Sequence, residues 1–150
     1  MLIFLDIDGV MVPAKSWRSP ELLKDGFPAF SLKACHTLQR MISDNDTVIL
    51  TTSHKSNFTI QEWKNIFKER GIEIAALKAL PENNSRMSRK DEILRWFNQN
   101  TINEEFLIID DDSSLNDLPT DLKKHLIQPS PFIGLSEDHL RDFDIVLSRK

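Results

Sequence analysis

The sequence has little cysteine, no excess of basic residues and no long hydrophobic run. Its only cysteine, Cys35, excludes an internal disulfide and lies on an apolar helical stripe, which favours a packing role. The formal net charge of −4 gives no overall basic field, so we do not expect broad nonspecific binding of nucleic acid. A net negative charge is nevertheless compatible with a local basic patch. Asp6 interrupts the first apolar run too early for a signal peptide or a membrane span, and we therefore expect a cytoplasmic protein.

The chain is long enough for one domain with a substantial core. It has 150 residues, of which 40% are hydrophobic and 28% charged, and we expect residues 1–150 to form a single domain. Short apolar runs alternate with longer helical stripes, which is typical of an α/β protein with a mainly parallel sheet. The runs expected to form strands are LIFL, TVIL, IEIAAL, FLII and HLIQ, at residues 2–5, 47–50, 72–77, 106–109 and 125–128.

Helices are predicted between these strands, in the segments 31–43, 58–71, 88–99 and 136–143. In the first segment the spacing places Leu32, Cys35, Leu38 and Ile42 on one apolar face. The third segment opens with a capping-box pattern from Ser88 to Asp91, and the fourth is expected to begin with Ser136 as its N-cap. His36, His125 and His139 are interpreted as helix-face or structural residues.

Polar residues with catalytic potential follow three of the predicted strands. Asp6 and Asp8 come after the first strand, Thr51 to Lys55 after the second, and Asp110 to Asp112 after the fourth. Ligands of open α/β sheets bind outside the carboxyl ends of the strands, so these groups are expected to meet in one crevice.

Such a crevice would hold up to four carboxylates, those of Asp6, Asp8, Asp110 and Asp111. Two carboxylates at ~4 Å repel each other by roughly 4 kcal/mol at an effective dielectric constant near ~20, so a cation is required between them. The candidate ligands are hard oxygens, and His54 is the only nitrogen donor nearby, which favours Mg²⁺. Magnesium sites of this kind usually complete their coordination with water and a substrate phosphate, which indicates phosphoryl chemistry.

The other polar groups suit phosphoryl transfer. The stretch TTSHK offers hydroxyls and free amides, with Thr51, Thr52 or Ser53 as the phosphate-binding residue, and Arg89 or Lys90 offers a cation. One aspartate of the D-x-D pair would attack phosphorus, and the other would protonate the leaving alkoxide and then activate water.

These motifs resemble those of the haloacid dehalogenase (HAD) superfamily of phosphohydrolases. LDIDGV is similar to its first motif, VILTT to the second, Lys90 within SRKDEILRWF to the third and FLIIDDD to the acidic fourth. The resemblance implies that Asp6 is the nucleophile and Asp8 the general acid/base, and that the fold is a three-layer, Rossmann-like sandwich with a five-stranded sheet. It extends to the HAD domains of bacterial RNA-repair proteins, through TTSHK, LIIDDDS and LIQPSPFIGLSEDH.

Two positions within these motifs have alternatives. Among the hydroxyls we favour Thr52, because that choice leaves Ser53 and His54 free to offer amides to a phosphate. Among the three consecutive aspartates we favour Asp110 and Asp111 as metal ligands, with Asp112 in reserve.

The chain has no room for a lid over the site. HAD enzymes that act on small metabolites usually carry a cap domain, and the loop from Pro13 to Pro28 and the segment KALPENNSRM are both too short to form one. The resemblance, together with these lengths, therefore implies a large substrate such as a phosphorylated nucleic-acid end or a phosphoprotein. His54, Lys55 and Trp17 are candidate substrate contacts. A phosphatase of small metabolites and a non-catalytic module that binds phosphorylated ends are the alternatives.

Two other functions fit the sequence less well. A calcium loop in DDDSSLND would need glycine where Leu115 stands. A phosphoacceptor domain of the receiver type would need an aspartate after the third strand, and the run IEIAALKAL supplies none.

Overall fold

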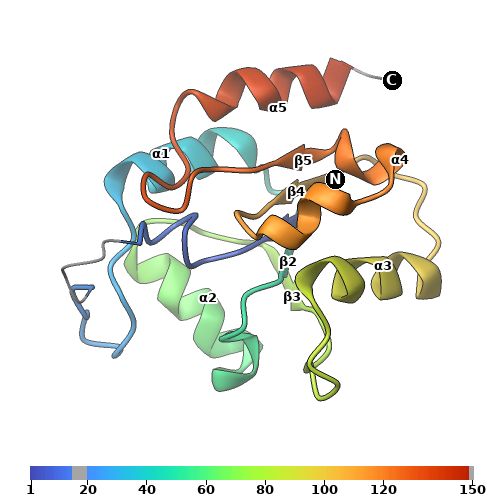
Figure 1. The fold of residues 1–150 in the computed structure, drawn as a ribbon. Coiled ribbons are helices and arrows are strands. Elements are labelled where there is room, and N and C mark those ends of the chain that lie inside the picture. Colours follow the sequence, from blue (N-terminus) through green and yellow to red (C-terminus); the bar gives the residue numbers. More distant parts are fainter. Residues whose placement is uncertain (15–19, 149–150) are drawn as a thin grey trace.

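The computed structural model describes residues 1–14 and 20–148, which form a three-layer α/β sandwich around an all-parallel sheet (Figure 1). The sheet has five parallel strands, as the sequence predicts, and their order is β3-β2-β1-β4-β5. Their bounds are β1 (Leu2–Leu5), β2 (Thr47–Leu50), β3 (Ala76–Ala79), β4 (Phe106–Ile109) and β5 (Leu126–Ile127). The order reverses at β1, where the chain crosses from β3 to β4.

Helices cover both faces of the sheet. One face carries α1 (Leu32–Met41), α2 (Ile60–Glu69) and α5 (His139–Ser148), and the other carries α3 (Arg89–Gln99), the 3₁₀ helix η2 (Ser113–Asp117) and α4 (Thr120–Lys123). A further 3₁₀ turn, η1 (Lys55–Asn57), follows β2. In Figure 1, α1 and α2 lie to the left of the strands, and α3 and α4 lie to their right.

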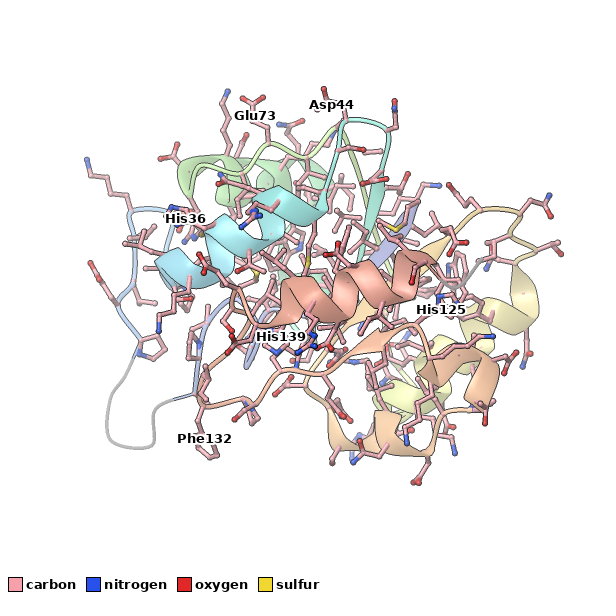
Figure 2. The ribbon with its side chains drawn as sticks, turned by 90° about the horizontal axis from the view of Figure 1, so that it is seen from above. His36, Asp44, Glu73, His125, Phe132 and His139 are labelled. Carbon is pink, nitrogen blue, oxygen red and sulfur yellow. The ribbon has the colours of Figure 1, made fainter. Side chains whose placement is uncertain are left out.

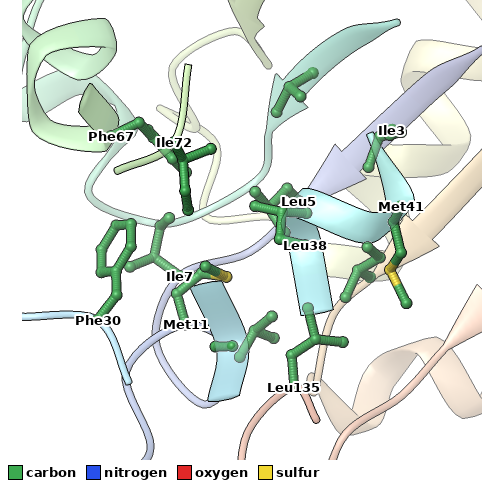
Figure 3. Packing of buried hydrophobic residues seen from close by; sticks show 14 of the residues in the cluster. Ile3, Leu5, Ile7, Met11, Phe30, Leu38, Met41, Phe67, Ile72 and Leu135 are labelled. Atoms are coloured by element: carbon green, nitrogen blue, oxygen red, sulfur yellow. The ribbon is translucent and has the colours of Figure 1, made fainter. Parts of the chain in front are cut away.

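The central strand β1 is buried on both faces because it lies between the two helical layers. Ile3 and Leu5 pack with Leu38 of α1 in the larger core cluster, which Figure 3 shows from close by. Phe4 points to the other face, where its ring meets Trp96 edge-on at a centroid distance of 5.0 Å. This two-sided burial explains why the strand is a continuous apolar run rather than an alternating one.

The third strand begins later than predicted. The sequence places it at residues 72–77, whereas β3 spans Ala76–Ala79. Ile72 is buried, but its amide donates to the carbonyl of Phe67 and so completes the end of α2. An apolar run can therefore serve first a helix end and then a strand, which periodicity alone does not separate.

Two helix predictions were also wrong in detail. The sequence spacing places Leu32 on the apolar face of the first helix, yet Leu32 is 76% exposed. Ser31 caps α1, so Leu32 is the first residue of the helix and points away from the core. Ser136 is not the N-cap of α5, since the helix begins at His139, whose Nδ1 accepts a hydrogen bond from the Ser136 amide. Among the described residues, no helix has the length and apolar character needed to cross a membrane.

The two leucines of α1 provide a direct test of this packing. We expect Leu38→Ala to lower the free energy of unfolding by roughly 2–5 kcal/mol, because it opens a cavity in the core where Leu38 is fully buried. The same substitution at exposed Leu32 should change it by less than about 0.5 kcal/mol. Urea denaturation measures both, and similar losses for the two variants would contradict the packing described here.

Candidate active site

The site lies at the carboxyl edge of the three central strands. Leu5 of β1 is in register with Leu50 of β2 and Ile109 of β4, so the residues that follow all emerge at one edge. The Asp6 amide donates to the Ile109 carbonyl at 3.0 Å, and the Thr51 amide donates to the Leu5 carbonyl at 2.9 Å. The backbone hydrogen bonds between the strands thus extend one residue beyond the strand ends and hold Asp6, Thr51 and Asp110 side by side.

Three of the four predicted carboxylates converge at this edge. Asp6, Asp110 and Asp111 each offer one oxygen, and these oxygens lie within 4.8 Å of one another. Asp6 and Asp110 are buried and Asp111 is half-buried. Three hard oxygen ligands at this spacing fit a divalent cation such as Mg²⁺. Asp8 is not in this cluster; its side chain is 57% exposed.

Burial changes the acidity of Asp6 and Asp110. The pKa of Asp6 is raised to about 9, first because the side chain is buried and second because Asp110 repels its charge, while Arg89 offsets part of both effects. Burial also raises the pKa of Asp110, against the opposing charge of Arg89. Full ionisation of Asp6, Asp110 and Asp111 would give the site more negative charge than one guanidinium balances, so a bound metal ion would favour the ionised form of Asp6.

The cation in contact with these carboxylates is Arg89, the first residue of α3. Its Nη1 donates to Asp110 Oδ2, lies 3.5 Å from Asp6 Oδ1 and lies 3.2 Å from the Thr51 hydroxyl. Burial acts to lower the pKa of Arg89, but the charges of Asp110 and Asp6 prevail and raise it. Lys90, the residue favoured from the sequence, is half-buried, and its backbone amide donates to Ser114 Oγ.

Arg89 lies next to a buried ion pair between Lys55 and Glu92. Lys55 Nζ donates to Glu92 Oε2 at 3.0 Å, and both residues are less than 9% exposed. The other oxygen of Glu92, Oε1, lies 3.6 Å from Arg89 Nε, a buried atom without a hydrogen-bond partner in the described residues. Glu92 therefore faces two cations and orients Arg89 toward the acidic cluster. Lys55, predicted as a substrate contact, is occupied in this pair.

The hydroxyls after β2 have different surroundings. The Thr51 hydroxyl donates to Asp110 Oδ2 at 2.9 Å, and the Thr52 hydroxyl accepts a hydrogen bond from the His54 amide at 3.2 Å. Both threonines are fully buried, whereas Ser53 is exposed. Of the three candidate residues, Ser53 is thus the most open to a ligand.

Asp8 has a partner that the sequence does not reveal. His54 Nε2 lies 2.7 Å from Asp8 Oδ2, and the His54 ring meets Phe27 edge-on at a centroid distance of 5.8 Å. His54, which we expected to contact substrate, holds Asp8 at the rim of the site instead. Trp17, the third predicted substrate contact, lies outside the described residues.

The reserve ligand Asp112 is engaged in local structure. Its Oδ1 accepts hydrogen bonds from the amide and the hydroxyl of Ser114 at 2.9 and 2.6 Å, which caps η2. Its amide donates to Asp110 Oδ1 at 3.1 Å. Asp112 therefore helps to orient Asp110 and keeps its own carboxylate outside the acidic cluster.

The turn after β1 brings Gly9 against Asp111. The Ile7 carbonyl accepts hydrogen bonds from the amides of three following residues, which closes a tight turn. Gly9 has a φ of +81°, and a Cβ there would lie 2.1 Å from Asp111 Oδ2. The glycine is needed both for its backbone conformation and to let the Asp111 carboxylate approach.

The remaining histidines lie away from this site, as expected. His36 is exposed on α1 and His139 begins α5, and both are labelled in Figure 2. His125 stacks on Phe106 at a centroid distance of 4.0 Å, and its Nδ1 lies 3.0 Å from the Phe106 carbonyl oxygen. These positions support structural roles.

Comparison with protein families matches residues 2–140 to the family described as the HAD domain in Swiss Army Knife RNA repair proteins. The chain belongs to this family. Membership in this HAD family implies a phosphohydrolase-type function and agrees with the Rossmann-like sandwich around the acidic site. Searches of curated proteins and of solved structures find no match.

Alanine substitutions at two glycines of this HAD domain distinguish the cost of backbone strain from the cost of a steric clash with Asp111. Gly26 has a φ of +79° with no atom within 4 Å of an added Cβ, so Gly26→Ala should cost only about 1–2 kcal/mol of unfolding free energy. Gly9→Ala should cost more, because the Asp111 carboxylate must also move, and the displaced carboxylate would hold a divalent cation such as Mg²⁺ less well. Urea denaturation and calorimetric titration measure the two effects. Equal stability losses with unchanged metal affinity would contradict the close approach of Asp111.

Proposed function

We propose that this HAD domain is a Mg²⁺-dependent phosphohydrolase that forms an aspartyl phosphate on Asp6 and acts on terminal phosphates of nucleic acid. The observation that carries the proposal is the position of Asp6. Its carboxylate lies beside Asp110, Asp111 and Arg89 at the sheet edge, while Asp8, two residues later, stands at the exposed rim. A nucleophile buried among charges and an acid open to the leaving group are what the two roles require.

The reaction has two displacements at phosphorus. In the first, an oxygen of Asp6 bonds to phosphorus as the ester P–O bond breaks, and Asp8 protonates the leaving alkoxide. In the second, Asp8 takes a proton from water, whose oxygen bonds to phosphorus as the bond to Asp6 breaks, releasing inorganic phosphate. Asp6, Asp110 and Asp111 would hold Mg²⁺, which would supply positive charge that offsets the repulsion between phosphate and carboxylates.

The groups around Asp6 stabilise the charge of the phosphoryl oxygens. Arg89 brings a guanidinium whose planar fork suits an oxyanion. Ser53 offers an exposed hydroxyl, and the Thr52 hydroxyl holds the loop by accepting from the His54 amide. Lys90, at the start of the same helix as Arg89, adds a second positive charge near the N-terminus of α3. His54 keeps Asp8 at the rim, where it can reach the leaving group.

The openness of the site favours a macromolecular end as substrate. In the described residues, the segment between β1 and α1 contains only two isolated bridges, Asp8 to Val12 and Leu22 to Pro28, and the segment between β3 and α3 contains no helix or strand. The described parts of these two segments form no lid over the site. The RNA repair proteins named in the family description make a terminal phosphate of RNA or DNA the substrate class to test first.

Substitutions of the two aspartates of the D-x-D pair should affect hydrolysis in different ways. With p-nitrophenyl phosphate and Mg²⁺, Asp6→Asn should abolish hydrolysis, because its amide cannot attack phosphorus. Asp8→Asn should lower kcat by roughly 10²–10⁴-fold, because proton transfer is lost. Asp6→Asn should leave the metal-free protein at least as stable as wild type, since it removes one of three crowded carboxylates.

Asp44→Asn provides the matched control. Asp44 is exposed in the turn before β2, at the opposite edge of the sheet (Figure 2), and its variant should keep full activity. Full activity in Asp6→Asn would contradict the assignment of the nucleophile.

Neighbouring cations of α3 should also differ in their effects. Arg89→Gln should lower kcat by roughly 10²–10³-fold, because it removes a preorganised donor next to Asp6. Lys90→Gln should have a smaller effect, since the Lys90 ammonium forms no ion pair with the carboxylates in the described part of the chain. Steady-state kinetics with p-nitrophenyl phosphate, together with thermal unfolding of each variant, check this order. A larger loss in Lys90→Gln would assign the phosphate-binding charge to Lys90.

A further inference from the structure

A cavity lies near the acidic site, between the β3–α3 loop and the face of α3 that carries Glu92, Trp96 and Gln99. Its volume is about 270 Å³, and it is separate from the cluster of Asp6, Asp110 and Asp111. Its lining includes three apolar side chains, Leu80, Met87 and Trp96, and three polar ones, Asn84, Arg95 and Gln99. We call it the α3 pocket. Figure 1 shows the β3–α3 loop, in yellow-green, next to the first turns of α3.

Both walls of the α3 pocket are held in place by the protein. In the loop, the Asn83 side chain donates to the Met87 carbonyl at 2.7 Å and accepts from the Met87 amide at 2.8 Å. On the helix, the Trp96 ring is fixed edge-on against Phe4 and Phe97, at centroid distances of 5.0 and 5.1 Å. A cavity with two ordered walls is ready for a ligand without a large cost of reorganisation.

The size and lining of the pocket favour a single heteroaromatic ring system. Its volume is just below the roughly 300–1,000 Å³ typical of sites for drug-sized ligands, so it suits a base rather than a whole nucleotide. The apolar side chains can cover the faces of a base. Asn84 and Gln99 can donate to and accept from its edge, and Arg95 can stack or donate. Glu82 and Glu92 also line the pocket, which disfavours a phosphate there.

The pocket also lies at a suitable distance from the reacting phosphate. Glu92 belongs to both places, because it lines the pocket and lies 3.6 Å from Arg89 Nε. Trp96 is seven residues beyond Arg89 on the same helix, or roughly 10 Å along its axis. A strand whose terminal phosphate is at Asp6 can therefore lay a nearby base along α3.

We propose that the α3 pocket binds a nucleobase close to the phosphorylated end of a single-stranded nucleic acid. The proposal rests on the proposed function for its substrate class, but it makes a separate claim. Base recognition in this pocket would make nucleic-acid ends better substrates than small phosphate esters, although both react at the same aspartate. The pocket would then determine specificity without touching the reacting atoms.

The kinetic test compares a substrate with a base and one without. The double variant Arg95→Ala, Gln99→Ala should lower kcat/KM by about tenfold for a short 3′- or 5′-phosphorylated oligoadenylate, which corresponds to about 1.4 kcal/mol of lost binding. Its hydrolysis of p-nitrophenyl phosphate should be unchanged. Asn98→Ala, an exposed residue of α3 outside the pocket lining, is the matched control and should leave both reactions unchanged.

An oligonucleotide with abasic residues next to the phosphate distinguishes the base from the backbone. Wild type should process it as poorly as the double variant processes oligoadenylate, and the double substitution should cause no further loss. An equal loss on p-nitrophenyl phosphate, or no loss on oligoadenylate, would overturn the proposal.

A binding measurement separates this proposal from the proposed function. Titration with oligoadenylate should change the tryptophan fluorescence of wild type, the abasic oligonucleotide should bind at least tenfold more weakly, and the double variant should lose the difference. If no phosphate ester is hydrolysed, the proposed function is wrong, but this measurement still tests whether the α3 pocket binds a base. Equal binding of the two oligonucleotides to wild type would overturn base recognition.

Discussion

The mutual repulsion of three carboxylates at the carboxyl edge of the sheet is the constraint on which the rest of the site depends. The register of β1 and β4 helps to bring oxygens of Asp6, Asp110 and Asp111 within 4.8 Å of one another, so all three can be ionised together only when positive charge lies beside them. Arg89 neutralises part of this charge from the start of α3. A divalent cation would offset the remaining negative charge of the carboxylates and would also attract a phosphate. This requirement for a cation connects the structure with phosphoryl chemistry.

The surrounding residues keep this arrangement in place. Glu92 faces Lys55 on one side and Arg89 on the other, so the guanidinium is oriented by a charge that is itself paired. On the opposite side, Gly9 lets the Asp111 carboxylate pack directly against the turn after β1. Removing one partner of a buried pair leaves an uncompensated charge, which costs more than the pair contributes. These supports are therefore expected to affect activity through position rather than through direct contact with substrate.

The sequence predicted the edge where the site forms better than the contacts within it. Residues that follow parallel strands must meet at one edge, so Asp6, Thr51 and Asp110 could be placed together without a structure. Which of Arg89 and Lys90 faces the carboxylates depends on the rotation of α3. That rotation is determined by the packing of Ile93 and neighbouring aromatic residues against the sheet.

Other parts of the site were not accessible to sequence reasoning. Lys55 and Glu92 are 37 positions apart and look like solvated charges in isolation, so their buried ion pair requires the tertiary fold. The exposed position of Asp8 and its hydrogen bond to His54 likewise depend on two loops that meet only in the folded protein. The late start of β3 has the same origin, because pairing with β2 decides where an apolar run becomes a strand.

The central claim, that Asp6 forms a covalent bond to phosphorus, is tested most directly by trapping the intermediate. The protein is mixed with Mg²⁺ and excess phosphorylated substrate, quenched in acid during turnover, and mapped by peptide mass spectrometry. The account predicts one phosphoryl group on the N-terminal peptide at Asp6, absent from Asp6→Asn. Turnover with no phosphorylated peptide at any quench time, or with the phosphoryl group on Asp110 or Asp111, would contradict it.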